Sequence, residues 1–286
     1  MTIKNNFLLK LLDFLHKSKL LLILVILPYT SYAIIIPTYS IDSVTVKNLF
    51  EKIGANSLVL INIDDTIITP KSNMFRYANP YAGFVDEIAV LKKYHSNIDE
   101  IIAKLILQRQ AMLVEANWSK FIDKLKSSGA LVFGFTKINP ACRRIENYEE
   151  WQYKQLSRLG IKFTDKVNNK EVLKFDETDK KSPIFYKGII FTDFLNKAQA
   201  LYEFMRITNI LPDNIIIFEN RRSELKNIDN FLKTVDLDYY GIEYLAVTEL
   251  KGIPQDNIVK LQQQTLLKTG KWLEDDDAKQ FIENNK

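Results

Sequence analysis

The sequence predicts an α/β fold built as a three-layer, doubly wound and mostly parallel sheet. Short apolar runs of strand length occur at 57–61, 130–135 and 214–218, and segments with helical spacing of apolar residues separate them. Polar residues follow directly after each run. Strands that alternate with helices in this way form mostly parallel sheets covered on both faces. We therefore expect one domain over residues 34–286.

The first expected strand is SLVLI at 57–61, which ends in the polar turn 62–66. A helical insertion is expected over about 72–126, between the first two core strands. Within it, apolar residues recur at helical spacing from 98 to 125, which indicates one long helix or two. These residues are Ile101, Ile102, Leu105, Ile106, Met112, Leu113, Phe121, Ile122 and Leu125.

The second expected strand is ALVFGF at 130–135, which ends at Thr136. A helix is expected at 145–159. The segment 161–193 contains the short strand-like runs IKF, VLKF and FYKGIIF between turn residues. This pattern predicts a small β-rich flap and not another strand–helix unit.

Helix is expected again at 197–207, before the strand NIIIF at 214–218. The continuous apolar character of this run is typical of a parallel strand that is buried on both faces. A helical segment follows it, and 240–248 supplies one further strand. A C-terminal helix is expected over about 254–284.

The N-terminus has the features of a secretory signal peptide, residues 1–33. A polar, lysine-containing start precedes the apolar run LLLILVIL at 20–27, and the small residues Ser31 and Ala33 suit cleavage after Ala33. The run is too short to cross a bilayer as a stable anchor. We expect export to the periplasm or beyond, with an uncleaved membrane anchor at 20–36 as the alternative.

The charge of the chain argues against nucleic acid as a partner. Lys and Arg number 39 and Asp and Glu 35, which gives a formal charge of +4. Cleavage after Ala33 removes four lysines and Asp13, so the mature chain carries +1. The remaining lysines are dispersed among acids. The sequence therefore predicts no nucleic-acid partner and no membrane contact beyond the signal segment.

The scarcity of cysteine and histidine excludes several kinds of site. Cys142 is the only cysteine, so the chain has no internal disulfide, and a buried inert thiol is its expected role. A cysteine phosphatase would need an arginine six positions after the cysteine, where Tyr148 stands. With His95 as the one histidine of the mature chain, a zinc site of histidines and cysteines and a Ser/His/Asp triad are both disfavoured.

Polar residues at the strand ends predict where a ligand binds. In open α/β sheets, ligands bind in a crevice at the carboxyl ends of the strands. The turn 62–66, Thr136 and the pair Glu219-Asn220 each follow an expected strand. We expect these residues to face one crevice.

The turn LINIDDTI resembles the first motif of the haloacid dehalogenase-like (HAD-like) phosphohydrolases, an apolar strand followed by Asp-x-Asp-x-Thr. Asn62, Asp64 and Thr66 fall on its three defined positions. A shift of register does not restore the motif, because starting at Asp64 or Asp65 would require an acid where Thr66 or Ile67 stands. Asn62 therefore occupies the position of the nucleophile.

The other three motifs of the family are matched in the correct order. Thr136, at the end of VFGFT, fits the second motif, and Lys197 fits the lysine of the third, with Lys187 as the competing choice. NIIIFEN places Glu219 and Asn220 at the paired acids of the fourth. The resemblance covers roughly residues 57–248 and is closest to a poorly characterised group of exported bacterial HAD-like proteins that carry a domain of unknown function.

The resemblance implies a defined chemistry, which this sequence alters. In the family, the first aspartate attacks phosphorus, the second acts as acid and base, and Mg²⁺ spans the first carboxylate, a backbone carbonyl and motif four. Asp64 keeps the acid/base position and its backbone carbonyl. An amide at residue 62 is a poor nucleophile, and loss of a nucleophile costs on the order of a million-fold in turnover.

Metal binding is expected to be weakened or lost, because Mg²⁺ prefers carboxylate ligands and here Glu219 is left with the amides Asn62 and Asn220. Thr136 and Lys197 remain as expected ligands for a phosphate or another anion. The leading expectation is an exported pseudoenzyme that binds a small anionic or phosphorylated ligand, or a protein partner, with little turnover.

Two alternatives stay open. One is an active Mg²⁺-dependent phosphatase in which Asp64 or Asp65 activates water for direct attack. The other is a structural or interaction module that uses the helices at 84–125 as its contact surface; an exposed apolar stripe there would favour it.

Overall fold

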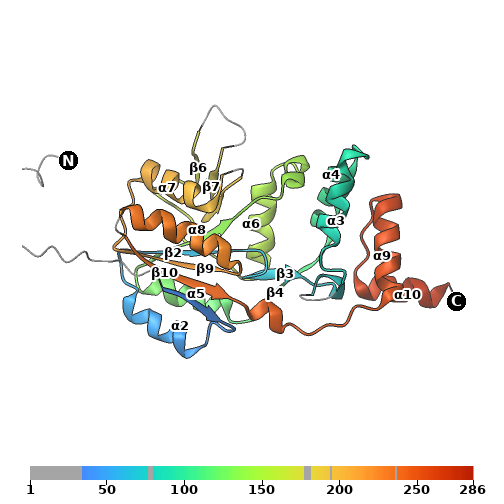
Figure 1. Ribbon diagram of the computed structural model, residues 1–286, viewed down its shortest axis with the longest axis horizontal. Coiled ribbons are helices and arrows are strands. Elements are labelled where there is room, and N and C mark those ends of the chain that lie inside the picture. Colours follow the sequence, from blue (N-terminus) through green and yellow to red (C-terminus); the bar gives the residue numbers. More distant parts are fainter. Residues whose placement is uncertain (1–33, 77–79, 177–181, 194, 236, 286) are drawn as a thin grey trace, which may run out of the picture. The chain divides into compact units, whose positions relative to one another are not determined.

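The computed structural model describes residues 34–285 except 77–79, 177–181, 194 and 236. The expected signal peptide, 1–33, lies outside the described residues. The described chain forms one eight-stranded sheet in the order β1-β10-β9-β2-β5-β8-β7-β6, with a separate pair β3-β4 (Figure 1). The strands are β1 Ile34–Thr38, β2 Ser57–Ile61, β3 Ile68–Pro70, β4 Ala111–Leu113, β5 Leu131–Thr136, β6 Val172–Lys174, β7 Ile184–Tyr186, β8 Ile189–Phe191, β9 Asn214–Glu219 and β10 Asp238–Tyr244.

Helices connect most of the strands. They are α2 Val44–Leu49, α3 Phe84–Val90, α4 Ile98–Gln108, α5 Trp118–Ser127, α6 Tyr148–Arg158, α7 Lys197–Thr208, α8 Arg222–Leu232, α9 Asp256–Thr269 and α10 Asp275–Asn284. In the described residues, no helix is both long and apolar enough to span a membrane.

The pairing confirms an α/β fold with a mostly parallel sheet. From β1 to β8 every neighbouring pair is parallel, and only the edge pairs β8-β7 and β7-β6 are antiparallel. From β2 the chain moves outward through β5 to β8, then returns to the other side of β2 for β9 and β10. The order of the strands therefore reverses between β2 and β9, the kind of position where open α/β sheets bind ligands.

Alternate residues of β2 pack into two apolar layers, one on each face of the sheet. Leu58 and Leu60 belong to the cluster that includes α7 and α8, and Val59 and Ile61 to the cluster on the opposite face. All four are fully buried, because a parallel strand in the middle of a three-layer fold has no solvent-exposed face. The ribbon has α7 and α8 on one side of the strands and α2 and α5 on the other (Figure 1).

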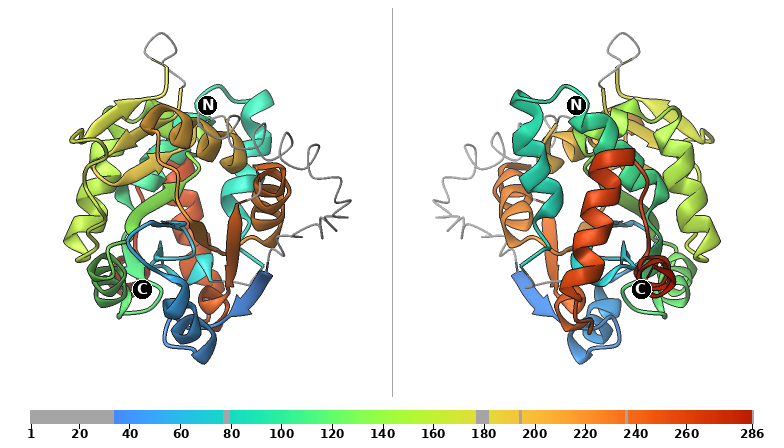
Figure 2. Two further views of the ribbon diagram at one scale, coloured as in Figure 1. Left: turned by 90° about the vertical axis from the view of Figure 1, so that its left-hand side faces the viewer. Right: turned by 90° about the vertical axis from the view of Figure 1, so that its right-hand side faces the viewer.

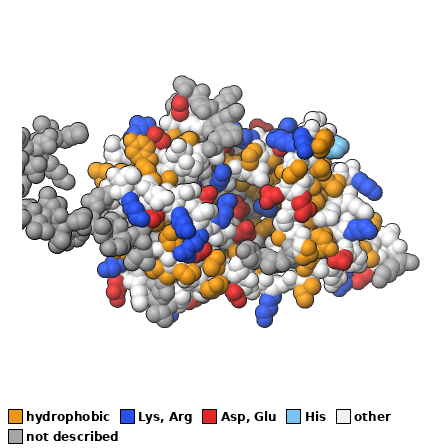
Figure 3. Space-filling view, viewed as in Figure 1, with side chains coloured by type: hydrophobic (Ala, Val, Ile, Leu, Met, Phe, Trp, Pro, Cys, Tyr) orange, Lys and Arg blue, Asp and Glu red, His pale blue; other side chains and the backbone are white. Residues whose placement is uncertain are grey.

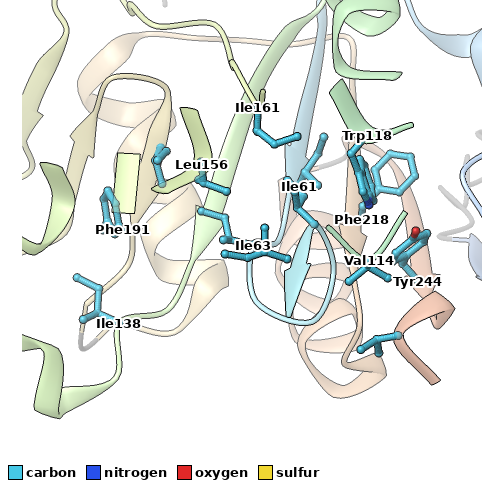
Figure 4. Close-up of a cluster of buried hydrophobic side chains, with 14 of the residues drawn as sticks. Ile61, Ile63, Val114, Trp118, Ile138, Leu156, Ile161, Phe191, Phe218 and Tyr244 are labelled. Carbon is cyan, nitrogen blue, oxygen red and sulfur yellow. The ribbon is translucent and has the colours of Figure 1, made fainter. Parts of the chain in front are cut away.

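An aromatic cluster on the second face joins α5 to the sheet. Trp118 packs edge-on against Phe121, Phe218 and Tyr244, with ring centroids 5.1–5.9 Å apart, and it is fully buried (Figure 4). Burial of rings of this size contributes strongly to the core. Thus α5, the C-terminal part of the expected insertion 72–126, packs directly on the core sheet.

The segment expected as one long helix or two contains two helices with a strand between them. α4 ends at Gln108, residues 111–113 form β4, and α5 begins at Trp118. β4 pairs antiparallel with β3, with Ile68 opposite Leu113. The apolar residues Met112 and Leu113 continue the helical spacing in sequence but belong to this strand.

The segment expected as a flap is instead partly core. FYKGIIF breaks at Lys187 and Gly188, which have φ angles of +44° and +88°; this left-handed turn, which glycine adopts without strain, separates β7 from β8. β8 pairs in parallel with β5 as a core strand, and only β6 and β7 form an antiparallel extension.

β1 was not predicted. It begins at Ile34, one residue beyond the expected cleavage point, and pairs in parallel with β10 along its whole length. Ile34 to Ile36 therefore lie in the sheet, although they also form the end of the alternative anchor 20–36.

The C-terminal segment forms two helices that pack beside the insertion. α9 ends at Thr269 and is capped by Gly270 (φ +70°), and two perpendicular views show α9 next to α3 and α4 (Figures 1 and 2). At the start of α10, the Asp275 carboxylate accepts hydrogen bonds from Ser72 Oγ (2.5 Å), the backbone N of Asn73 (2.9 Å) and Gln262 Nε2 (2.9 Å). Asp275 thereby ties the C-terminal helices to the loop that follows β3.

Replacement of Asp275 tests this connection. Asp275→Ala removes three hydrogen bonds to a charged acceptor and leaves the groups of the 72–73 loop unpaired, so we expect a loss of about 2–4 kcal/mol of unfolding free energy. Urea denaturation measures it. Asp277→Ala is the matched control, since Asp277 lies exposed in the same first turn of α10. Equal losses in the two variants would contradict the role given to Asp275.

Candidate functional site

Four of the residues expected at the site meet at the carboxyl edge of the sheet. Asn62 follows β2, Glu219 ends β9, Asn220 comes next, and Lys197 is the first residue of α7. The backbone N of Asn62 donates to Phe218 O of β9 (2.8 Å), which extends the β2–β9 pairing into the turn. The side chains of all four residues are connected by hydrogen bonds.

A buried ion pair forms the centre of this group. Lys197 is 2% exposed and Glu219 0%, and Lys197 Nζ makes a short hydrogen-bonded contact with Glu219 Oε2. The second oxygen, Oε1, accepts from the backbone N of Arg221 (3.0 Å). The ammonium also lies 5.2 Å from the centre of the Phe135 ring. Burial of two charges is tolerated only when both are paired and hydrogen-bonded in this way.

The ion pair fixes the orientation of the Asn62 amide. Lys197 Nζ donates to Asn62 Oδ1 (2.8 Å). Because an ammonium can only donate hydrogen bonds, the amide oxygen and not the amide nitrogen must face it. The amide nitrogen then points the other way, and its two N–H groups are shared among Asp64 O (2.7 Å), Thr66 Oγ1 (3.0 Å) and Asn220 Oδ1 (3.0 Å). Asn62 is 4% exposed. Both ends of its side chain are fully used.

These residues do not fit Mg²⁺ in the manner that the resemblance implies. The metal would need oxygen ligands from residue 62, from Asp64 O and from motif four. Here the amide N–H groups of Asn62 point at Asp64 O and at Asn220 Oδ1, and an amide nitrogen has no free lone pair for a metal. Rotation of the amide would bring its oxygen to the metal side but would place its N–H groups against the Lys197 ammonium.

Asp64, at the acid/base position, opens to solvent in the cleft while protein encloses it on its other sides. The resulting desolvation raises the pKa of its carboxyl above the ordinary value, and Asp65 raises it further; the charges of Arg109, Lys197 and Arg221 act in the opposite direction. The carboxyl therefore holds its proton to a higher pH than a free aspartate.

Asp65 is positioned by the local turn. It has a φ of +56°, which aspartate tolerates better than most residues, and its Oδ1 accepts a hydrogen bond from Thr69 (2.9 Å).

A cleft of about 400 Å³ lies above the hydrogen-bonded group, between the strand ends and the helices α3 and α4. Acidic and basic side chains gather around the hollow on the face drawn in Figure 3. The cleft is lined by Asp64, Asp65, Pro70, Phe75, Ala82, Val85, Asp86, Ile106, Arg109, Lys137, Asn139, Cys142, Tyr148, Asn220 and Arg221.

The expected anion ligands Thr136 and Lys197 are not among the residues that line this cleft. Thr136 ends β5 and is 3% exposed, and Lys197 directs its ammonium at Glu219 and Asn62. The competing Lys187 lies in the β7–β8 turn, with its ammonium 5.2 Å from the Tyr153 ring. The anion-binding role of Thr136 and Lys197 stays a prediction.

Sequence reasoning missed three basic residues of the cleft. Lys137 directly follows Thr136, and Arg221 directly follows Asn220, so their positions after strand ends could have identified them. Arg109 lies after α4 in the insertion, and no sequence signal pointed to it.

Cys142 is buried, as expected. Burial raises the pKa of its thiol to about 12, which keeps it protonated and unreactive at neutral pH although it borders the cleft.

The ion pair can be tested by a double-mutant cycle. Lys197→Met leaves the Glu219 carboxylate buried and unpaired, so we expect it to cost about 3–5 kcal/mol, and the double variant Lys197→Met/Glu219→Gln to cost much less than the sum of the single changes. Denaturant unfolding of the four proteins gives the coupling. Lys154→Met, which removes one partner of the exposed pair with Glu150, is the control and should have little effect. Additive costs would show that the pair does not act as a unit.

Comparison with known proteins places the chain among relatives without an assigned activity. An uncharacterised protein of Rickettsia prowazekii is 48% identical over 269 residues, which cover 94% of this chain and 98% of that protein. Two proteins named "Putative outer membrane protein", from Chlamydia pneumoniae and Chlamydia trachomatis, are 25% identical over 49% and 55% of this chain and 50% and 57% of their own lengths. No solved structure matches the chain significantly. The family described as "Protein of unknown function (DUF2608)" matches residues 41–279, and the chain belongs to this family.

Proposed function

We propose that this protein is an exported, HAD-like protein that binds a small anionic ligand in the cleft and does not hydrolyse phosphate esters through residue 62. The observation that carries the proposal is the locked amide of Asn62. Its oxygen accepts from Lys197, and its nitrogen donates to Asp64 O, Thr66 Oγ1 and Asn220 Oδ1.

The placement of the motif residues supports the HAD-like part of the proposal. Asn62 and Glu219 end the two strands between which the strand order reverses, Thr136 ends the neighbouring strand β5, and Lys197 begins the helix after β8. Four motifs that are separately weak thus lie at one edge of one sheet, and Lys197 reaches the residue that the resemblance assigns as its neighbour. The proximity of these residues in space supports the motif assignment in addition to their order in the sequence.

The chemistry of the group argues against turnover. The nucleophilic step needs an oxygen lone pair with negative charge, and the Asn62 oxygen is neutral and already accepts from Lys197. Water activation by Asp64 would need an ionised carboxylate, whereas desolvation raises the pKa of this group. Asp65, the other candidate base, accepts from Thr69. A ligand in this cleft would be held by charge and hydrogen bonds without an efficient nucleophile beside it.

Export is proposed from the sequence of residues 1–33, and the names of the two chlamydial relatives agree with it.

The interaction-module alternative has mixed support. Most of the apolar stripe of α4, including Ile102 and Leu105, is buried, which disfavours a contact surface there. However, Val90 at the end of α3 and Tyr94 just after it are 63% and 71% exposed, and Leu91 and Leu107 are 39% and 42% exposed. A few exposed apolar side chains are ordinary on a protein surface and do not favour this function over ligand binding.

A phosphatase assay tests the absence of turnover. The chain without residues 1–33, incubated with p-nitrophenyl phosphate and Mg²⁺, should release nitrophenol no faster than the buffer alone, because residue 62 supplies no nucleophile. Asp64→Ala should have the same rate. Turnover that depends on Mg²⁺ and disappears in Asp64→Ala would favour the active phosphatase instead.

The loss of the metal site is tested separately, by heat denaturation with and without 10 mM Mg²⁺. The wild-type melting temperature should not change. Asn62→Asp/Asn220→Asp puts a carboxylate at both amide positions. If the Kd of this variant for Mg²⁺ is about a hundredfold below the Mg²⁺ concentration, its melting temperature should rise by several degrees. Asn139→Asp adds a carboxylate at the exposed rim of the cleft and should show no such response. A Mg²⁺-dependent rise in the wild-type chain would overturn the reading of the Asn62 amide.

A further inference from the structure

Three cations border the cleft, and none of them has a close ion pair of its own. Within the described chain, Arg109 and Lys137 have no acidic oxygen within 4.0 Å, in contrast to the surface pairs such as Lys154–Glu150. Arg221 Nε is 4.0 Å from Glu219 Oε1, but Glu219 is already paired with Lys197. Arginine side chains present planar donor groups that suit phosphate and carboxylate.

The three cations come from different elements that converge on one space. Arg109 follows α4, Lys137 follows β5 and Arg221 precedes α8. Arg109 and Arg221 both interact electrostatically with Asp64 at the floor of the cleft, so their charges act on the same region. Lys137 is exposed and lies at the rim.

The acidic residues of the cleft limit the charge that a ligand can carry. Asp64, Asp65 and Asp86 also line it. Since like charges in a confined space repel strongly, a polyphosphate or a nucleic acid does not match this lining. One anionic group next to the two arginines does.

An apolar wall also lines the cleft. It consists of Pro70 at the end of β3, Phe75 in the loop after β3, Val85 of α3 and Ile106 of α4. Phe75 packs on Trp272, with ring centroids 5.6 Å apart, and so has a fixed position. The volume of about 400 Å³ suits a small organic molecule and exceeds what an inorganic anion would fill.

From this lining we infer the class of ligand: a small organic monoanionic or phosphate-monoester compound, with its single anionic group on Arg109 and Arg221 and an apolar or aromatic group against Phe75, Val85 and Ile106. The inference rests on the proposed function and deepens it, since it moves the anion from Thr136 and Lys197 to basic residues outside the four motifs.

Calorimetric titration of the chain without residues 1–33 tests the inference, with phenyl phosphate as the probe and inorganic phosphate, phenol and tripolyphosphate as comparisons. Phenyl phosphate should bind at least about tenfold more tightly than each of the other three, since only it fills both parts of the cleft. Arg109→Gln and Arg221→Gln should each weaken it by about tenfold or more. Lys226→Gln, a charge loss at an exposed site of α8 outside the cleft, should have no effect.

The apolar wall is tested by Val85→Ser. Val85 is half-buried, so the fold should tolerate the change; phenyl phosphate should then bind only as well as inorganic phosphate, whose own affinity stays unchanged. Equal affinity of the two compounds for the wild-type chain would overturn the apolar part. Binding that survives both arginine changes but is lost in Thr136→Ala would overturn the anion assignment.

The same samples distinguish failure of the proposed function from failure of the inferred ligand class. Release of phenol from phenyl phosphate would show turnover and contradict the proposed function, yet would leave the ligand class standing. Absence of binding by all four compounds would overturn the ligand class, while leaving the absence of turnover untouched.

Discussion

The arrangement of the candidate site depends on the contact between Lys197 and Glu219. Both side chains are almost completely removed from water, so each charge requires the other. The ammonium then has a donor left for Asn62 Oδ1, which decides the direction of the Asn62 amide and thereby the character of the whole edge of the sheet. Residue 62 therefore presents N–H groups to the surrounding oxygens.

This network is consistent with the proposed function, because it uses the side chain of residue 62 for structure. An asparagine at residue 62 has the size of an aspartate, but its N–H groups donate to Asp64 O and Asn220 Oδ1, which an ionised carboxylate could not do. The positive charge of Lys197 would be excessive beside a neutral amide, but Glu219, one methylene longer than an aspartate, reaches it directly. Asn62 and Glu219 are therefore physically coupled through Lys197: Asn62 accepts from the ammonium without a charge of its own, and Glu219 supplies the charge that compensates it.

The sequence predicted the central strands well, because β2, β5 and β9 are continuous apolar runs and such runs have few other interpretations. The meeting of Asn62 and Glu219 also followed from sequence, since residues after parallel strands share an edge, whereas Lys197 was assigned only through the resemblance. β1 was missed because Ile34–Ile36 continue the apolar character of the N-terminal segment. β4 was read as helix because Met112 and Leu113 keep the helical spacing, and pairing with β3 outweighed it.

The cleft was harder to predict than the residues beneath it. Arg109 belongs to the insertion, and its position over Asp64 is set by how α4 packs, which no local pattern records. The position of a charged residue of the cleft such as Arg109 thus depends on tertiary packing, whereas Asn62 and Glu219 are positioned by the ends of their strands.

One wall of the cleft depends on contacts with the C-terminal helices, which follow all the strands of the sheet in the sequence. Phe75, part of the apolar wall of the cleft, packs against Trp272, and the loop before Phe75 donates hydrogen bonds to Asp275. Every strand of the sheet precedes residue 245. A nascent or truncated chain that ends there contains all the residues that line the cleft, but it lacks the support for one wall. In such a chain the sheet can therefore form while the loop that carries Phe75 still lacks its contacts with Trp272 and Asp275.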